Sequence, residues 1–459
     1  MFIYLLLIFL TTLLPIKLLW NYFSNPINSL PGPKFYEITP YDFMKYPSDL
    51  IYEWIQKYGM TFCWKLIGNK SFIVTIDPKI IKLVFSQEYK NTQKMDVGLK
   101  NITGGHGLLA NENYHNYPEH DFQRKLFKCK LTKKEIRDSI PEYQMIIEKL
   151  ITKWNNEINK SENKQITIDL KYEFTRLTLE VLCELLLDYD INSINNEFIA
   201  NDLYDTLTKY FKTFNNYTIL GYQYIGSGIK YLPIKNNYDY WTSRHKLSNL
   251  ISSIMLNHMK NNNKTNKLID LIMNSELSNI EIFDNILTFL LAGHETTASC
   301  LSWTLYELCL NPDYIKNIND KKFMNNIINE SLRLHPPVPL IARKVLKDFY
   351  VNDINIPSDT NIIISILGSH LRSDYWENPL LFNPNRWNNI KINPYIYMPF
   401  LSGPRSCIGK EFALKEIELA LNSLLTEFNF ELSKNSKVVN KVDFTSKPDQ
   451  LIVNITKRV

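Results

Sequence analysis

The sequence feature that most constrains the fold is a ten-residue run around a lone cysteine, Phe400 to Gly409. Glycines on either side of Cys407, at 403 and 409, let the backbone pass close to a flat neighbouring group. Residues 408–425 have helical spacing, so the positive end of a helix dipole points back at the sulfur. The run therefore predicts a cysteine that is favoured as a thiolate at the start of a helix.

Composition bounds the class of protein. A chain of 459 residues with 45% hydrophobic and 13% aromatic content can bury a large core, which excludes general disorder. The net charge of +5, from 52 basic and 47 acidic residues, is too mild to indicate nucleic-acid binding. The six cysteines form no CxxC pair and no cysteine-histidine cluster, so a zinc ribbon or an iron-sulfur site is not indicated. Free cysteines of this kind fit a reduced, cytosol-facing interior.

The first twenty residues predict a membrane anchor. Residues 1–20 are apolar except for Thr11, Thr12 and Lys17, and about twenty such residues cross a bilayer as a helix. Lys17 and Lys34 favour a cytosolic location for the C-terminal side of this segment. We expect an anchor over 1–20, a proline-rich hinge over 21–33 and a catalytic domain over 34–459. The alternative is a hydrophobic first helix packed on the body.

The rest of the chain predicts a body that is mainly α with small β-sheets. Residues 61–67 and 71–76 flank Gly68-Asn69 and indicate an early β-hairpin. From about 119 to 310 the hydrophobic periodicity is mostly helical. Short strand patterns return at 349–356 and 361–367. No repeat and no strong linker divides residues 29–459, so we expect one large body.

Five positions of the cysteine run fit a known loop: Phe400, Gly403, Arg405, Cys407 and Gly409. With each residue at roughly one in twenty, chance gives about 10⁻⁴ per chain. The run resembles the haem-binding loop of the cytochrome P-450 family. The resemblance implies haem b between a distal helix (I) and the cysteine loop with its following helix (L), Cys407 as axial ligand and Arg405 on a haem propionate. An axial thiolate favours O–O cleavage.

A second motif lies in the apolar stretch 286–310, where Ala292-Gly-His-Glu-Thr-Thr297 places an acid on a helix that is buried nearly all round. Glu295 must therefore be paired, protonated or facing water. The resemblance implies that Glu295 and Thr296 relay protons to dioxygen, and that Ala292 and Gly293 leave room for it. Taken alone, Thr296 is better explained as a mid-helix threonine whose hydroxyl caps a backbone carbonyl.

A third motif is Glu330-Ser-Leu-Arg333, an i,i+3 pair that is a commonplace salt bridge by itself. The family pairs such residues with an arginine from a later loop, and Pro384-Asn-Arg-Trp supplies Arg386. This implies a buried structural network of Glu330, Arg333 and Arg386. The chain has Asn385 where the family usually has an acid, a departure that we expect to be tolerated.

Further cofactor contacts follow from the same resemblance. Arg343 matches an arginine that binds a haem propionate, and residues 338–341 before it would line the pocket. Upstream the family commonly has Trp-x-x-x-Arg, whereas this chain has His120-Asp-Phe-Gln-Arg124. Arg124 is then a propionate ligand and His120 a candidate donor. The altered segment leaves propionate binding less secure than thiolate ligation.

Residues 124–137 carry a run of basic side chains, which are Arg124, Lys125, Lys128, Lys130, Lys133, Lys134 and Arg137. A solvated helix face explains such a run by default. The resemblance places it, with Lys410 and Lys415, where an acidic NADPH-cytochrome reductase or a cytochrome b5-like donor docks. Such steering depends on salt.

These motifs together imply a membrane-anchored haem monooxygenase of the endoplasmic reticulum that inserts one atom of dioxygen into a lipophilic substrate. The weakest inference is the pocket, drawn from Phe289, Leu290 and an aromatic run that is more often core. That run consists of Tyr204, Tyr210, Phe211, Phe214 and Tyr217. The acid Glu295 and the anchor favour hydroxylases of fatty acids and other lipophiles. Alternatives are a non-catalytic haem-binding relative, a reductase-independent isomerase or dehydratase, and a purely structural membrane protein.

Overall fold

The computed structural model describes residues 25–34, 37, 47–66, 70–95, 100, 103–112, 119–220, 231–232, 234–261, 265–442 and 445–458. These residues form two compact units. The first, which we call the sheet unit, contains the described residues up to 95 together with 339–379 and 392–406. The second, the helical unit, contains those in 96–338, 380–391 and 407–459. The expected anchor, 1–20, lies outside the described residues, as do residues 21–24 of the expected hinge.

The sheet unit is built on one five-stranded sheet with the order β1-β2-β8-β5-β3. Its strands are β1 (Thr61–Leu66), β2 (Lys70–Thr75), β8 (Asn361–Ser365), β5 (Leu340–Val345) and β3 (Thr92–Lys94). The predicted hairpin β1–β2 is confirmed, with Phe62 opposite Val74. β2 and β8 pair in parallel and the other neighbours are antiparallel. Strands from two distant parts of the chain therefore form a single sheet.

Both faces of this sheet are buried, because successive side chains of a strand point to opposite faces. In β2, Phe72 and Val74 pack in one cluster with Trp54, whereas Ile73 packs in another with Ile364. The unit also contains short elements, which are η2 (Pro26–Ser29), α4 (Pro47–Tyr58), α5 (Pro78–Lys82), η3 (Leu83–Gln87), η4 (Tyr89–Asn91), β6 (Phe349–Val351), β7 (Ile354–Ile356), α17 (Ile366–His370) and η9 (Gly403–Arg405).

The strand predicted over 361–367 is two residues too long. β8 ends at Ser365, whose hydroxyl accepts a hydrogen bond from the Gly368 N–H at 3.0 Å and caps α17. Ile366 and Leu367 therefore start a helix, although their side chains suit a strand. The predicted segment 349–356 is confirmed as the hairpin β6–β7, with Asn352 and Asp353 in left-handed conformation at its turn.

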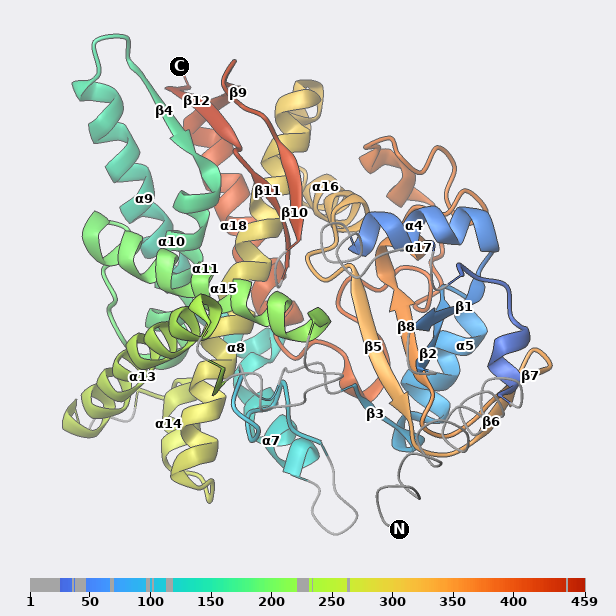
Figure 1. Ribbon diagram of the computed structural model, residues 1–459. Coiled ribbons are helices and arrows are strands. Elements are labelled where there is room, and N and C mark those ends of the chain that lie inside the picture. Colours follow the sequence, from blue (N-terminus) through green and yellow to red (C-terminus); the bar gives the residue numbers. More distant parts are fainter. Residues whose placement is uncertain are drawn as a thin grey trace. The chain divides into compact units, whose positions relative to one another are not determined.

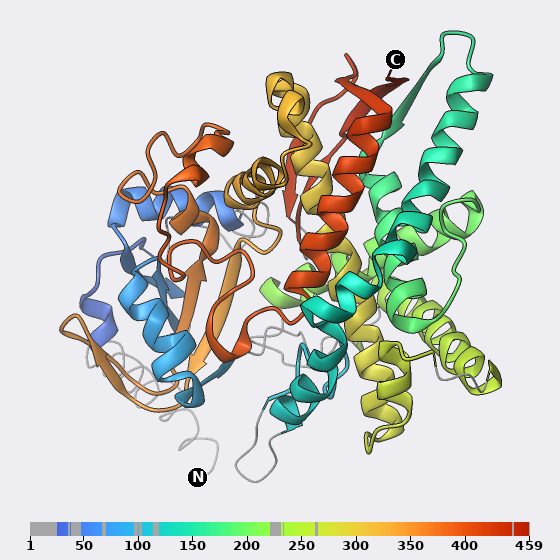
Figure 2. The same cartoon turned by 180° about the vertical axis from the view of Figure 1, so that it is seen from behind.

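The helical unit surrounds one long helix, α15 (Asn279–Leu310), which Figures 1 and 2 show passing through its middle. A capping box between Ser278 and Glu281 starts this helix. Most of its side chains between 286 and 308 are buried, as the sequence predicted, whereas Leu310 at its end is 51% exposed. The other helices are α7 (Glu119–Lys128), η5 (Cys129–Leu131), α8 (Lys133–Asp138), α9 (Ile140–Lys160), α10 (Leu170–Leu187), α11 (Glu197–Leu220), α13 (Lys235–Asn261), α14 (Leu268–Met273), η7 (Pro312–Asn317), α16 (Lys321–Leu334), η8 (Pro384–Asn388) and α18 (Lys410–Glu427).

Two small sheets complete the helical unit. One has the order β4-β12-β9 and consists of β4 (Gln165–Asp169), β12 (Ile452–Lys457) and β9 (Phe428–Leu432). The other is the hairpin of β10 (Val439–Val442) and β11 (Ser446–Asp449). β11 lies against α15. A fold that is mainly α with small β-sheets is thus confirmed.

Candidate active site

The cysteine loop begins in the sheet unit, where Gly403 is required by its conformation. Its φ of +76° is rarely adopted by L-amino acids, and a Cβ there would lie 2.0 Å from the Phe85 carbonyl oxygen. The turn closes with the Ser406 N–H donating to the Gly403 carbonyl at 3.0 Å. Phe400 and Arg405 belong to the same segment of the sheet unit. These contacts fix the turn from Gly403 to Ser406 that precedes the cysteine.

Cys407 opens the last segment of the helical unit and precedes Gly409, the N-cap of α18. Its side chain is accessible at the surface. Burial by the surrounding protein raises the pKa of the thiol above its ordinary value, and the backbone N–H groups of Gly409 and Lys410 and the charge of Arg124 offset part of this rise. An accessible thiol that faces N–H donors and a cation suits a ligand that binds metal as a thiolate. These residues fit a haem iron.

The acid and the alcohol of the distal motif lie on α15. Glu295 is 7% exposed, and its Oε1 lies 2.5 Å from Nζ of Lys447 on β11. Of the three possibilities that the sequence left for this acid, the structure shows a pair. Thr296 donates its hydroxyl to the Ala292 carbonyl at 3.0 Å, and Thr297 donates to the Gly293 carbonyl at 3.0 Å.

Gly293 faces α10. A Cβ on this residue would lie 2.1 Å from Cδ1 of Leu182, so the missing side chain lets α10 pack against α15. The helices are also joined by Thr178, whose hydroxyl donates to the His294 carbonyl at 3.1 Å. His294 itself is buried, and burial lowers the pKa of its imidazole. Gly293, which was expected to leave room beside Glu295 and Thr296, therefore serves the packing of α10 on α15.

The expected propionate ligands divide between the two units. Arg343 is 5% exposed, with its guanidinium carbon 5.5 Å from the centroid of the Phe85 ring, in the sheet unit with Arg405. Arg124 is half-buried on α7 in the helical unit. On the same helix His120 is 3% exposed, and its Nδ1 lies 3.2 Å from a carboxylate oxygen of Asp121. Of the four basic residues expected to bind propionates, Arg343 and Arg405 thus belong to the sheet unit, and Arg124 and His120 belong to the helical unit.

The network predicted around Glu330 is confirmed and is larger than expected. Oε1 of Glu330 accepts from Nη2 of Arg333 at 2.8 Å, from Nε of Arg386 at 2.9 Å and from the Asn383 N–H at 2.9 Å. Oε2 accepts from Nε of Arg333 and from the Trp387 indole, each at 2.9 Å. Glu330 and Arg333 are fully buried. The network fixes η8 on α16.

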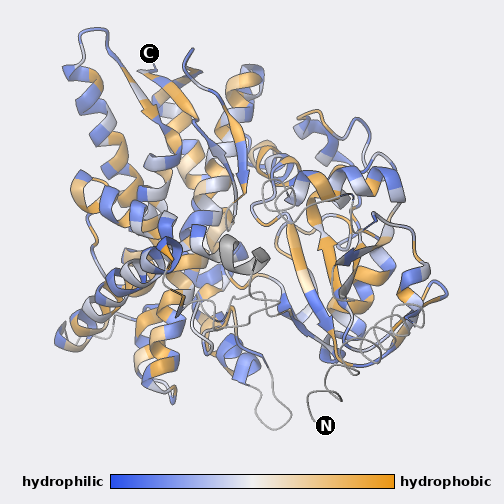
Figure 3. Ribbon diagram, in the orientation of Figure 1, coloured by the Kyte–Doolittle hydropathy of each residue, from blue (hydrophilic) through white to orange (hydrophobic). Residues whose placement is uncertain are grey.

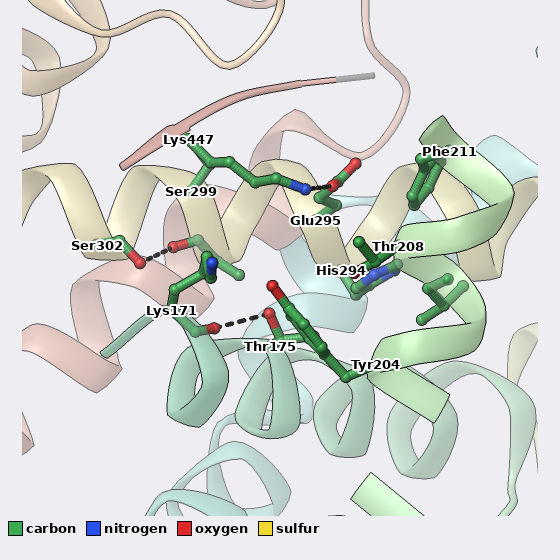
Figure 4. A pocket seen from close by; sticks show the side chains of 12 residues that line it. Lys171, Thr175, Tyr204, Thr208, Phe211, His294, Glu295, Ser299, Ser302 and Lys447 are labelled. Atoms are coloured by element: carbon green, nitrogen blue, oxygen red, sulfur yellow. Dashed lines mark hydrogen bonds and ion pairs between the residues drawn. The ribbon is translucent and has the colours of Figure 1, made fainter. Parts of the chain in front are cut away.

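Part of the aromatic run lines a pocket, which Figure 4 shows between α10, α11, α15 and β11. Tyr204 and Phe211 lie in its wall. Tyr210 is instead buried core, stacked on Tyr240, and Phe289 packs edge-on against Phe127 at 5.4 Å. Leu290 is also buried core, and the side chains at 214 and 217 lie outside the described residues.

The pocket also contains a residue that sequence reasoning missed. Lys447 stands about 150 positions after Glu295, in a segment whose local pattern carries no functional signal. Trp387 and the Asn383 N–H were likewise missed as partners of Glu330, although Trp387 ends the Pro384-Asn-Arg-Trp motif.

The basic run lies on α7, η5 and α8, and α7 is largely hydrophilic in Figure 3. Lys125, Lys128 and Lys410 are exposed. Lys130 donates to Glu135 at 3.1 Å, and Lys133 lies 3.8 Å from Glu411 at the start of α18. The run is therefore a basic surface beside the beginning of the helix that follows Cys407.

An accessible cysteine before one helix, and an acid next to an alcohol on a second, buried helix, define a haem-thiolate type of protein. Comparison with known proteins identifies it further: the sequence model of the cytochrome P-450 family matches residues 29–455, so the chain belongs to that family. Cytochrome P-450 3A14 of Cavia porcellus is 25% identical over 458 residues, which are 89% of this chain and 87% of the relative.

Two shorter matches have higher identity. A probable cytochrome P-450 525A1 of Dictyostelium discoideum is 31% identical over 59% of this chain and 52% of its own length. Cytochrome P-450 3A5 of Homo sapiens is 35% identical over 36% of this chain and 38% of its own length. The protein is therefore an oxidoreductase of the monooxygenase type that uses haem b with a cysteine thiolate as axial ligand.

Membership also implies a redox partner, dioxygen and a lipophilic substrate in general terms. These relatives do not favour a non-catalytic protein or a reductase-independent isomerase or dehydratase. Among the described residues, no helix has both the length and the apolar character that crossing a membrane requires. The anchor over 1–20 stays a prediction.

Proposed function

We propose that Cys407 is the axial thiolate ligand of the haem and that the enzyme hydroxylates a lipophilic substrate. The observation that carries this assignment is the accessible thiol at the start of α18, with the N–H groups of Gly409 and Lys410 directed at it. When bound, the haem iron supplies the activation of dioxygen, which no side chain of the chain can supply. Arg405, Arg343, Arg124 and His120 are the proposed donors to its propionates.

The chain's own contribution to the chemistry is the supply of protons. We assign Glu295 and Thr296 as the pair that moves protons from solvent to the reduced dioxygen. Glu295 can accept a proton at its carboxylate, and the Thr296 hydroxyl can donate one while it accepts another. The bond from Thr296 to the Ala292 carbonyl, 3.0 Å, orients this hydroxyl within the helix. Phe400, Gly403 and Gly409 shape the loop, and Ala292 leaves space beside Thr296.

The remaining assignments concern electron supply and location. The basic surface of α7 and α8 is the proposed docking site for an NADPH-cytochrome reductase, or for a cytochrome b5-like donor. Residues 1–20 are the proposed single-pass anchor in the endoplasmic reticulum, residues 21–33 the hinge, and 34–459 a catalytic domain that faces the cytosol. Fatty acids and similar lipophiles are the proposed substrate class.

Thr296→Ala tests the relay. Loss of the hydroxyl should leave the reduced carbon monoxide spectrum unchanged and divert oxygen to peroxide, because proton delivery slows. Thr297→Ala is the matched control, since Thr297 makes the same bond to a carbonyl four residues earlier at 3.0 Å. Equal yields of peroxide from the wild type and Thr296→Ala, or equal effects of the two variants, would refute the role of Thr296.

A further inference from the structure

The carboxylate of Glu295 is held by a cation from a distant part of the chain. Nζ of Lys447 lies 2.5 Å from Oε1 of Glu295, and the two side chains are 9% and 8% exposed. Figure 4 shows the Lys447 side chain extending from β11 across the surface of α15 to reach this oxygen. When a lysine and a glutamate are both buried, removing either one leaves the other as an unpaired buried charge, which is unfavourable.

The strand that carries Lys447 is fixed on both sides of this residue. The Ser446 N–H donates to the Pro337 carbonyl at 2.8 Å, and the hydroxyl of Ser299, one turn after Glu295 on α15, donates to the Ser446 carbonyl. Two residues beyond Lys447, Asp449 lies 2.5 Å from Nζ of Lys171 on α10. Lys447 therefore approaches Glu295 from a defined backbone position.

The second carboxylate oxygen of Glu295, Oε2, differs from Oε1 in its contacts. Oε2 is buried and has no hydrogen-bond partner in the part of the chain that the structure describes. Glu295 and Lys447 line the same pocket as the hydroxyl groups of Thr175, Ser299 and Ser302. A polar pocket of this kind offers water several hydrogen-bonding partners. Oε2 is thus the carboxylate atom that Lys447 does not hold.

In the proposed relay, Glu295 also has to pass protons to Thr296, whose side chain lies on a different side of α15. Adjacent residues of an α-helix project about 100° apart, so the pocket-lining side chain of Glu295 and the side chain of Thr296 point in different directions. A carboxylate that passes protons from the pocket to Thr296 needs a fixed resting position on the pocket side. Lys447 supplies the contact that defines this position.

We propose that Lys447 is a positioning residue for proton delivery: it holds Glu295 by Oε1, which leaves Oε2 as the atom that takes up and releases the proton. This inference rests on the relay proposed above. For each proton delivered, Glu295 accepts one proton from the pocket side and releases one toward Thr296, so the carboxylate is restored. No electron passes through the pair, and bulk solvent replaces the proton that the pocket loses.

Lys447→Met removes the charge and keeps most of the length of the side chain. The test uses the full-length holoprotein with a purified NADPH-cytochrome reductase and no added substrate. Oxygen then leaves either as peroxide, which takes two electrons and two protons, or as two waters, which take four of each. We expect the fraction of oxygen recovered as peroxide to rise several-fold in Lys447→Met, with an unchanged reduced carbon monoxide spectrum.

Two variants separate positioning from simple packing. Lys447→Arg retains the cation and should keep most of the wild-type partition between water and peroxide. Leu207→Met changes an apolar side chain that lines the same pocket from α11 and leaves the Lys447–Glu295 pair in place. Wild-type partition in Leu207→Met is expected. An increase in peroxide as large as that of Lys447→Met would overturn the proposal.

A double variant tests whether Lys447 acts through Glu295. Glu295→Gln alone should raise the peroxide fraction, and adding Lys447→Met should change it no further. If Glu295→Gln raises peroxide and Lys447→Met does not, the inference about Lys447 fails and the relay stands. If neither variant raises peroxide, both fail. Additive effects of the two substitutions would also overturn the inference, because Lys447 would then act independently of Glu295.

Discussion

Replacing Glu330 by glutamine should be nearly as damaging as replacing it by alanine. The carboxylate accepts five hydrogen bonds, three at Oε1 and two at Oε2. An amide has one acceptor atom and one NH₂ group that only donates. In either orientation the NH₂ group of Glu330→Gln would face at least two donors, from Arg333 together with Trp387 or Arg386. Similar size therefore gives no protection.

The expected cost follows from the charges that are left behind. The side chain of Arg333 is fully buried and that of Arg386 is 9% exposed, so both guanidinium groups lose their counter-ion inside the protein. Removing one partner of a buried ion pair costs about 3 to 5 kcal/mol. Folded domains are stable by only about 5 to 15 kcal/mol, so this loss is a large fraction of the total. Glu330→Asp keeps the charge and should cost less.

Urea unfolding measures this cost, followed by tryptophan fluorescence, together with the yield of protein that retains haem. The matched control is Asp313→Asn on η7. Asp313 and Lys316 have the same i,i+3 spacing and an N···O distance of 2.7 Å, but their side chains are 88% and 76% exposed. The control should show no measurable shift of the urea midpoint, because surface pairs of this kind contribute little.

The effect should also depend on pH. Burial opposes ionisation of Glu330, but the hydrogen bonds and charges of Arg333 and Arg386 outweigh it, so the pKa of Glu330 lies below its ordinary value of 4.5. The stabilisation is therefore complete above that value and is lost as the pH falls through the lowered pKa. The gap between wild type and Glu330→Gln should narrow in acid. A wild-type urea midpoint in Glu330→Gln at neutral pH would refute this reasoning.

Two further expectations concern α18 and the basic surface. Burial raises the pKa of Glu416 well above its ordinary value, and neither carboxyl oxygen has a hydrogen-bond partner among the described residues. The unfolded chain releases this proton at lower pH than the folded chain. Between the two pKa values, wild-type stability therefore falls by about 1.4 kcal/mol for each unit by which the pH rises. In urea unfolding, the stability of Glu416→Gln relative to the wild type should therefore increase as the pH rises above 4.5, the ordinary pKa of a glutamate, with Glu418→Gln as control; a difference independent of pH would contradict this. Lys128→Glu on α7 should slow reduction by the reductase several-fold and weaken its salt dependence in stopped-flow measurements. An equal effect of Lys316→Glu on η7 would refute docking at the basic surface.

Motifs whose residues are close in sequence could be predicted with their geometry. The pair Glu330–Arg333 lies within one helical turn, and Gly403 serves one tight turn, so spacing alone indicated their arrangement. The apolar periodicity of residues 286–310 likewise predicted a buried helix that α15 confirms. Local chemistry decides these features, and local sequence records it.

Features that depend on distant segments could not be predicted. The parallel pairing of β2 with β8 joins residues nearly 300 positions apart, and no local pattern specifies such a partner. The same holds for Lys447, whose only distinction is the strand position that brings it to Glu295. Gly293 is predicted from its local motif to leave room for dioxygen. Its contact with Leu182 of α10, a distant segment, shows that it also serves helix packing.

The central assignment, Cys407 as thiolate ligand, is tested most directly by the absorbance of the reduced protein with carbon monoxide. The wild type should show the red-shifted Soret band of a thiolate-ligated haem, and Cys407→Ser should lose it. Cys129→Ser, which changes the other exposed cysteine of the described residues, should keep the band. A Soret band at the position of histidine-ligated haem in the wild type, or a red-shifted band that survives in Cys407→Ser, would contradict the assignment.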